Sequence, residues 1–343
     1  MSKKESNCNS GCKEQFKTMI GGQALIEGIM MLGPDKSAVV VRTKDELKTK
    51  IEDRPKKITG FSLKQLPFIR GVFNFWTSMK TGVSAMMYSA DCMIDEESEE
   101  PVENPSKLDA WLEKNLSTGA FTTIAVILGI LMSVGLFVIL PSFIGSVIEP
   151  FIPGGKTMLY LIEGLLRIVI LVGYMFVMSF MKDMKRVFAY HGAEHKTIRC
   201  YEAKLPLTVE NVRNQTRLHP RCGTSFLFVV LFLSILVFSI AGTLLEPVTT
   251  MITASIEPGT LKNILDALVK VATKLVFLPV VVGIAYEINR LVGRYDNWFT
   301  RAISAPGMWL QFITTKEPDD SMIEVGIAAL SAVIPEEEGS DLW

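Results

Sequence analysis

The sequence is poor in histidine and carries no excess of charge of either sign. Its 343 residues include 35 Lys and Arg, 36 Asp and Glu and three His, which gives a formal net charge of −1 at pH 7. This balance excludes a strongly basic nucleic-acid-binding protein. Five cysteines, an odd number in a long chain, exclude a disulfide scaffold.

Several familiar motifs are also missing. The glycines at 21, 22 and 28 fit neither the dinucleotide-binding fingerprint nor a phosphate-binding loop, and we interpret them as turn and bulge positions in a small sheet. No Gly-x-Ser-x-Gly elbow or Ser-x-x-Lys element occurs in a convincing context. The first twenty residues lack the apolar run of a signal peptide, and we expect residues 1–18 to be a disordered tail.

Long apolar runs dominate the rest of the chain, of which 49% is hydrophobic. A bilayer is crossed by about 20 residues of helix. Four runs reach that length, at about 121–147, 158–181, 224–245 and 268–288. The fourth is the weakest, because Lys270 and Lys274 lie near its start and Pro279 interrupts it. We therefore expect a mainly α, polytopic membrane protein with a four-helix transmembrane domain over 119–290.

Basic residues beside these runs predict the orientation. The loop 182–223 contains nine Lys and Arg, whereas the connections 149–157 and 246–267 contain one each. Because loops rich in Lys and Arg stay inside the cell, we expect this loop and both termini in the cytosol.

The polar parts of the chain predict a small cytosolic β-rich segment over 19–65, in which a Gly-Pro-Asp turn precedes the β-branched run SAVVVRT. Residues 66–94 carry apolar side chains at helical spacing. They predict an amphipathic helix that lies at the membrane interface or packs against the cytosolic domain. Residues 95–118 read as an acidic linker. Residues 291–343 form a cytosolic C-terminal segment, with a helix that ends at Pro335.

All three histidines fall in the loop 182–223. His191 and His195 are four residues apart, so on a helix both rings lie on one face and can reach one cation. With Glu194 they form His-x-x-Glu-His, the inverted zincin pattern, in which two histidines hold zinc and the glutamate is the general base. Zinc suits hydrolysis because it polarises a carbonyl and acidifies water.

Catalytic zinc usually has three protein ligands. The third could be His219, Cys222 or Glu202, the last of which is seven residues beyond His195 on the same helical face. If the second apolar helix continued through the loop, His191 would lie about 15 Å past the bilayer edge. A short helix in LTVENVRNQTR could then carry the chain back, so that the three rings converge. A structural histidine cluster at a membrane interface is the alternative.

Four segments together resemble the YqhQ-type family. They are GGQALIEGIMMLGP at 21–34, YHGAEHKTI at 190–198, HPRCGTSF at 219–226 and PGMWLQFITTKEPDD at 306–320. Members of this family are bacterial membrane proteins of unknown function, often described as predicted metal-dependent enzymes. The resemblance implies a bacterial inner-membrane protein with both termini inside.

Three hypotheses follow. The first is a zinc-dependent hydrolase with its site at the cytosolic membrane face, acting on a peptide bond or a lipid-linked amide or ester. The second is a membrane scaffold, assembly factor or regulator, whose β-rich part and C-terminal helix bind a cytosolic protein partner. The third is a small transporter, suggested by the charges of Glu163, Arg167, Lys270 and Lys274 in or near apolar runs.

Overall fold

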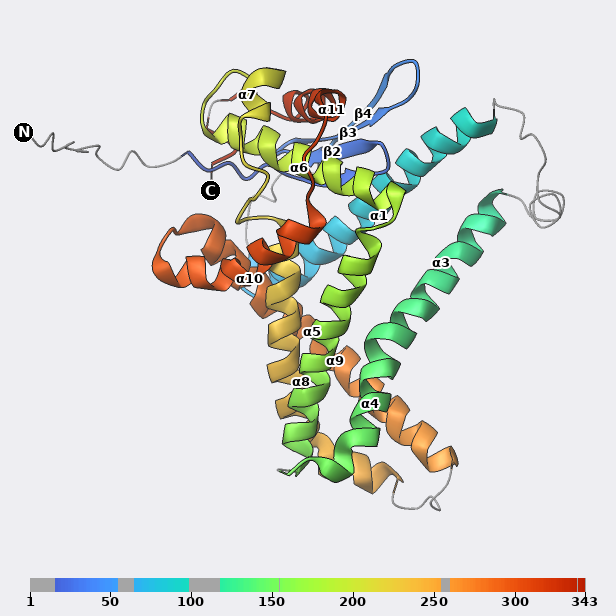
Figure 1. Ribbon diagram of the computed structural model, residues 1–343. Coiled ribbons are helices and arrows are strands. Elements are labelled where there is room, and N and C mark those ends of the chain that lie inside the picture. The colour runs from blue at the N-terminus through green and yellow to red at the C-terminus, as the bar shows by residue number, and fades with distance from the viewer. Residues whose placement is uncertain are drawn as a thin grey trace, which may run out of the picture. The chain divides into compact units, whose positions relative to one another are not determined.

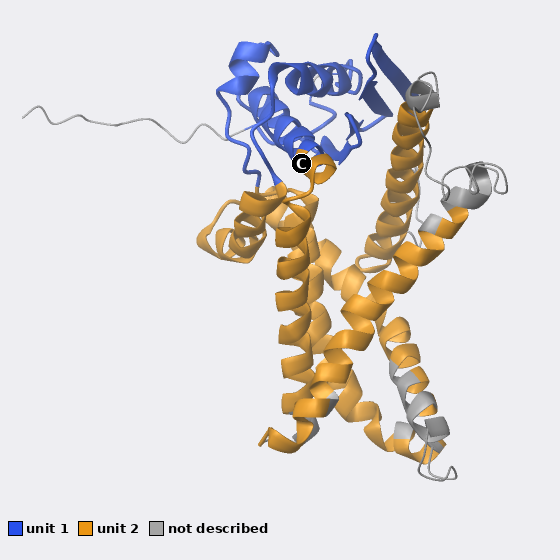
Figure 2. Ribbon diagram, turned by 45° about the vertical axis from the view of Figure 1, so that its right-hand side comes forward, with its two compact units in different colours: residues 1–57, 186–219, 315–343 blue, residues 58–185, 220–314 orange. Residues whose placement is uncertain are grey.

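The computed structural model describes residues 16–54, 65–98, 118–153, 155–253, 260–337 and 339–342. The expected disordered tail, apart from its last three residues, and most of the acidic linker lie outside these ranges. The chain divides into two compact units, which Figure 2 distinguishes by colour. The first unit unites residues 1–57, 186–219 and 315–343, and the second comprises 58–185 and 220–314.

The described part of the first unit contains a four-stranded antiparallel sheet, as the β-rich pattern predicted. Its strands pair in sequence order and are β1 (Gly21–Leu25), β2 (Gly28–Leu32), β3 (Lys36–Arg42) and β4 (Leu47–Asp53). β1 and β2 form a tight hairpin in which Leu25 pairs with Gly28. Glu27 in this turn has a φ of 51°, a left-handed conformation that is uncommon outside glycine.

Two helices share a hydrophobic core with one face of the sheet: α6 (Lys182–Glu202) and α11 (Asp320–Ser331) (Figure 1). Ile29, Met31, Ala38 and Val40 point to this face, because side chains alternate along a strand. They share the core with buried side chains of α6 (Ala189, Tyr190, Ala193 and Ile198) and of α11 (Met322, Val325, Ala329 and Leu330). Burial of this apolar face is the main term that holds α6 in place.

The hairpin turn is also tied to α6 by polar contacts. Arg186 donates through Nε and one terminal nitrogen to the Glu27 carboxylate, and the Tyr190 hydroxyl donates to it over 3.1 Å. Burial raises the pKa of Tyr190 well above its ordinary value, so this hydroxyl stays a donor at neutral pH. Side chains of α6 therefore stabilise Glu27 in its left-handed conformation, and the same contacts attach the hairpin turn to α6.

A third short helix, α7 (Val209–Arg213), follows α6 within the LTVENVRNQTR segment, where the sequence indicated one. α11 begins with Asp319 as its N-cap, whose carboxylate accepts from Met322 N over 3.0 Å. This helix ends at Ser331, before Pro335, as predicted.

The second unit is helical in its described part. Its main helices are α1 (Ile69–Ser98), α3 (Thr118–Val134), α4 (Leu140–Ile148), α5 (Gly155–Met178), α8 (Gly223–Thr253), α9 (Thr260–Arg294) and α10 (Trp298–Thr314). A π-helical turn, η2 (Gly135–Ile139), joins α3 to α4, and η3 (Glu149–Phe151) is a short 3₁₀ turn. Pro141 lacks the N–H that would bond the Phe137 carbonyl, which accounts for irregular winding there without a break.

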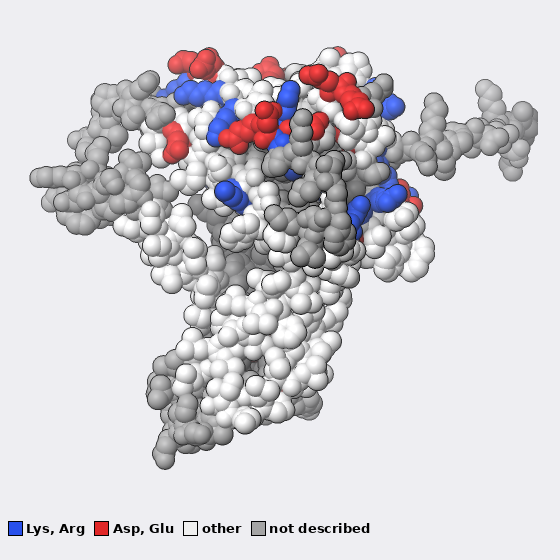
Figure 3. Space-filling view, turned by 180° about the vertical axis from the view of Figure 1, so that it is seen from behind, with Lys and Arg blue, Asp and Glu red and all other residues white. Residues whose placement is uncertain are grey.

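Four helical segments among the described residues are long and apolar enough to cross a membrane: Val126–Gly145, Met158–Met178, Gly223–Ile252 and Val271–Arg294. They match the four predicted runs. Figure 3 shows a wide surface of these helices without charged side chains. The second run does not continue straight into the histidine segment, because the helix is interrupted at residues 179–181 between α5 and α6.

Two opposite charges within the apolar segment of α5 are paired with each other. Arg167 donates to Glu163 over 3.0 Å within α5, and the Ser142 hydroxyl of α4 donates to the same carboxylate oxygen over 3.3 Å. Gly145 of α4 lies so close that an added Cβ would be 2.9 Å from Glu163 Cγ. This contact set favours a structural role for the pair in joining α4 to α5.

The helix predicted over 66–94 is α1, and one end of it packs against α9. Arg70 forms an ion pair with Glu287, and the Asn74 side chain donates to the Tyr286 hydroxyl over 2.8 Å. Gly71 permits the approach, because an added Cβ would lie 2.7 Å from Tyr286 Cβ. The prediction of an interfacial position for the rest of α1 remains a prediction.

We expect Gly192→Ala to destabilise the protein by about 2–3 kcal/mol. The new methyl group would lie 2.0 Å from the main-chain oxygen of Lys316, whose N–H donates to the Phe188 carbonyl over 2.8 Å, so backbone must move. Gly173→Ala in α5 is the matched control, because its Cβ meets nothing within 4 Å and alanine favours the helix. Thermal unfolding of the purified protein measures both, and equal melting temperatures would contradict the packing described here.

Candidate metal centre

Helix α6 brings the first two histidines together. The ring centroids of His191 and His195 are 4.4 Å apart, with an interplanar angle of 65°. His191 is half-buried, whereas His195 is 1% exposed. The helix itself is favoured by Asp183 in its first turn and Arg199 in its last, which suit the helix dipole. One turn of α6 therefore presents both imidazoles on one face.

The tautomer of His195 is fixed by its surroundings. Its Nδ1 lies 2.5 Å from the main-chain oxygen of Arg217, and a carbonyl oxygen can only accept a hydrogen bond. Nδ1 therefore carries the proton, which leaves the lone pair of a neutral ring on Nε2. That nitrogen is buried and has no hydrogen-bond partner among the described residues. A buried, unpartnered lone pair is the donor that a divalent metal ion requires.

The third histidine reaches the same region of the first unit. The ring centroids of His195 and His219 are 5.7 Å apart, and His219 is 5% exposed. Its Nε2 lies 3.3 Å from Glu202 Oε2, and the other Glu202 oxygen accepts from Thr18 N over 3.1 Å. Glu202, a candidate ligand by sequence, thus lies against a histidine. A cation held by His219 would bind at Nδ1, with Glu202 orienting the ring.

Glu194 is buried, at 5% exposed, and lies against the first strand of the sheet. A Cβ added at Gly22 of β1 would be 3.1 Å from Glu194 Cδ. The glycine that the sequence suggested as a bulge position therefore leaves room for this carboxylate.

Side chains of α6 form hydrogen bonds to the segment that leads to His219. The sequence pattern did not predict this role for Lys196 and Arg199. Lys196 Nζ donates to the Arg213 carbonyl over 3.0 Å, and Arg199 Nε donates to the Leu218 carbonyl over 2.7 Å. Lys196 is 5% exposed and its Nζ also lies 2.6 Å from Glu317 Oε2. A lysine beside the His-x-x-Glu-His motif was the available signal, but its partners are distant in sequence.

Cys222 belongs to the second unit and is half-buried, and its sulfur accepts from the Thr224 hydroxyl over 3.4 Å. It follows His219 by three residues in the chain. A cysteine sulfur is a ligand that zinc takes, so Cys222 stays a candidate ligand on its residue type and its place in the chain. Cys200 is the cysteine of α6 itself. Burial raises the pKa of its thiol, which disfavours the reactive thiolate and indicates a packing role.

Comparison with known proteins identifies a family but assigns no activity, substrate or metal to it. The profile of the DUF1385 family, described as a protein of unknown function, matches residues 66–336. A curated protein of Bacillus subtilis (strain 168), the uncharacterized protein YqhQ, is 31% identical over 328 residues, which cover 94% of each chain. The chain belongs to this family. No solved structure matches it. The resemblance seen in the four sequence motifs is thereby confirmed, and the centre described above is a feature to be tested across the DUF1385 family.

We expect Gly22→Ala to lower stability by about 1–3 kcal/mol, because the new Cβ would lie 2.6 Å from the Met30 carbonyl oxygen and would crowd Glu194. Gly21→Ala is the control on the same strand, since its Cβ meets nothing within 4 Å. Melting temperatures of the two variants give the comparison. A Gly22→Ala protein as stable as Gly21→Ala would show that β1 does not lie against α6 as described.

Proposed function

We propose that this protein is a zinc-dependent hydrolase embedded in the bacterial inner membrane, with its site on the cytosolic side. The four membrane-length apolar helices support insertion. The nine Lys and Arg of the loop 182–223 support a cytosolic position for the histidines. The family and the Bacillus subtilis relative are described without an activity, so family membership is no evidence for hydrolysis.

The proposal is carried by one observation, the buried and unpartnered Nε2 of His195. The described residues fit a zinc ion because this nitrogen is the unprotonated one and because a second imidazole lies beside it. A histidine whose other nitrogen donates to a main-chain carbonyl is typical of metal ligands. A purely structural histidine in this position would leave a polar atom without a hydrogen bond, which is costly in a folded core.

We assign His191 and His195 as the first two ligands and His219 as the favoured third. The Glu202 carboxylate beside His219 Nε2 supports this choice, since such carboxylates orient ligand histidines. Cys222 competes for the third position, and its thiolate would bind zinc well. Under this assignment Glu202 supports a ligand and is not itself one.

Zinc, when bound, would polarise the scissile carbonyl and acidify water. The chain's own contribution begins with Glu194, whose carboxylate would take a proton from the attacking water and return it to the leaving group. Burial of Glu194 against β1 limits its contact with bulk water and so favours proton transfer within the site. Candidate substrates are a peptide bond or a lipid-linked amide or ester.

The purified protein should bind about one zinc ion, and the His191→Ala, His195→Ala double variant should bind none. Zinc at about 100 times its Kd should stabilise the wild type by about 2.7 kcal/mol and leave the double variant unchanged. Metal content by mass spectrometry and thermal unfolding provide the two measurements. His219→Ala and Cys222→Ala, assayed in parallel, identify the third ligand as the residue whose loss lowers affinity more. Equal zinc content in the wild type and the double variant would overturn the assignment.

Replacing Glu194 by Gln should keep zinc bound but reduce hydrolysis by about 10²–10⁴-fold, because the proton acceptor is lost. The assay uses a fluorogenic peptide mixture and a fluorogenic acyl ester with the zinc-loaded protein in detergent. Glu210→Gln, at an exposed position of α7, is the matched control and should keep full activity. Hydrolysis unchanged in Glu194→Gln would favour the scaffold hypothesis, in which the histidine cluster is structural.

A further inference from the structure

Helix α10 has two faces of different character. The face formed by Thr300, Ser304, Gly307, Leu310, Gln311 and Thr314 is buried. The opposite face carries large aromatic side chains that are more than half exposed. Trp298 is 80% exposed, Trp309 68% and Phe312 54%. These positions fall on one side of a helix with 3.6 residues per turn.

α10 lies across the beginning of α8 (Figure 1), and Gly307 of its buried face makes the contact. Gly307 makes the crossing possible, because an added Cβ would lie 2.4 Å from Ser225 Cα. The Gln311 side chain donates to the Thr224 hydroxyl over 3.4 Å. α8 begins at Gly223, which is also where its membrane-length apolar segment begins. α10 therefore crosses α8 at the edge of that segment.

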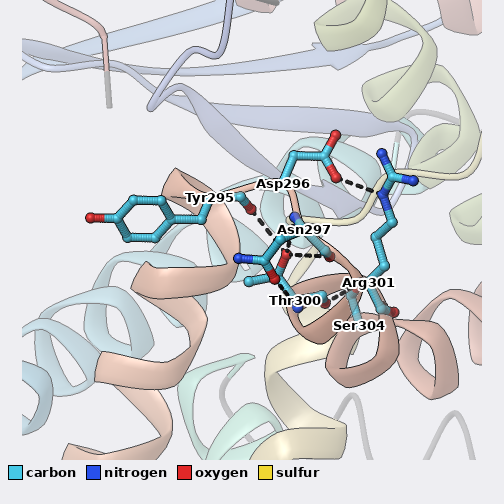
Figure 4. A network of polar contacts seen from close by, with 6 residues as sticks. All are labelled: Tyr295, Asp296, Asn297, Thr300, Arg301 and Ser304. Carbon is cyan, nitrogen blue, oxygen red and sulfur yellow. Dashed lines mark hydrogen bonds and ion pairs between the residues drawn. The ribbon is translucent and has the colours of Figure 1, made fainter.

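At the other end of α10, a network of hydrogen bonds forms the corner between α9 and α10 and fixes the start of α10 (Figure 4). Thr300 N donates to the Asn297 side-chain oxygen over 3.0 Å, and Asn297 N donates to the Thr300 hydroxyl over 3.1 Å. This reciprocal pair is a capping box, which satisfies two backbone N–H groups and fixes where the helix begins. Arg301 Nε donates to Asp296 over 2.7 Å across the same corner. The corner follows directly after Arg294, where the last membrane-length segment ends.

We propose that α10 is an in-plane interfacial helix, whose Trp298, Trp309 and Phe312 enter the boundary between lipid headgroups and acyl chains. The inference rests on the proposal that the four apolar helices cross a bilayer. It goes beyond the metal centre, because it concerns a different unit and a different ligand, the phospholipid surface.

Three features favour lipid over a protein occupant. α10 packs on the start of the membrane-length segment of α8 and follows the end of that of α9, which is where the interface would lie if these segments cross a bilayer. Tryptophan is enriched at that depth because its ring is apolar and its N–H polar. Arg290 and Arg294, in the last turns of α9, supply positive charge that anionic headgroups attract. A helix of this kind lies about 5–10 Å into the boundary.

The test follows the fluorescence of a full-length variant that keeps Trp309 while phenylalanine replaces the other tryptophans. The protein is reconstituted in vesicles of phosphatidylcholine and phosphatidylglycerol that contain brominated lipid. We expect Trp309 to lose most of its fluorescence when bromine is near the headgroup and less when bromine is near the chain end. Blue-shifted emission without quenching would place Trp309 against protein, and water-like emission would place it in solvent. Either result would overturn the inference.

A second variant separates this inference from the membrane proposal itself. I240W is made in a background where phenylalanine replaces all five native tryptophans, Trp309 included. Its single tryptophan then lies on the exposed middle of α8, since Ile240 is 61% exposed. It should be quenched most by bromine near the chain end. Quenching of I240W with none for Trp309 would reject the interfacial helix alone. Absence of quenching in both would reject insertion of the four helices. Melting temperatures of both variants in detergent establish that each has folded.

Discussion

The candidate metal centre depends on hydrogen bonds from α6 side chains to main-chain carbonyls at the end of α7 and in the segment after it. Lys196, His195 and Arg199 donate to the carbonyls of Arg213, Arg217 and Leu218. Because a carbonyl can only accept, this arrangement fixes the proton of His195 on Nδ1. It also fixes the chain just before His219. Ring orientation, tautomer and the return of the third histidine thus come from one set of contacts.

Close packing on both sides of α6 gives that helix its position. Gly22 of β1 approaches Glu194 on one side, and Gly192 of α6 meets the main chain of Lys316 on another. Neither approach tolerates a Cβ without movement of its neighbours. Interiors packed at this density transmit small shifts, so the sheet and the C-terminal segment both position the proposed ligands and base.

In the second unit, charged side chains lie among apolar helices. Glu163 pairs with Arg167 and Glu287 with Arg70, so that each carboxylate has a cation beside it. Isolated charges in such surroundings are costly. Ser142 links the first pair to α4, and the second pair joins α1 to α9. Glu163 and Arg167, two of the four charges named in the transporter hypothesis, therefore have a structural account.

Local pattern in the sequence determined the four apolar helices, the β-rich segment, the helix that ends before Pro335 and the pairing of His191 with His195. Each follows from a period of 2 or 3.6, or from the sheer length of an apolar run. Only the tertiary structure decided the tautomer of His195 and the hydrogen bond from Lys196 to the Arg213 carbonyl. It also decided the place of Glu202 beside His219 and the exposure of the aromatic face of α10. These depend on partners far away in the chain, and Pro306 within α10 obscured its helical pattern. Local periodicity reports which face of an element is apolar, whereas a donor's partner is chosen by the folded chain.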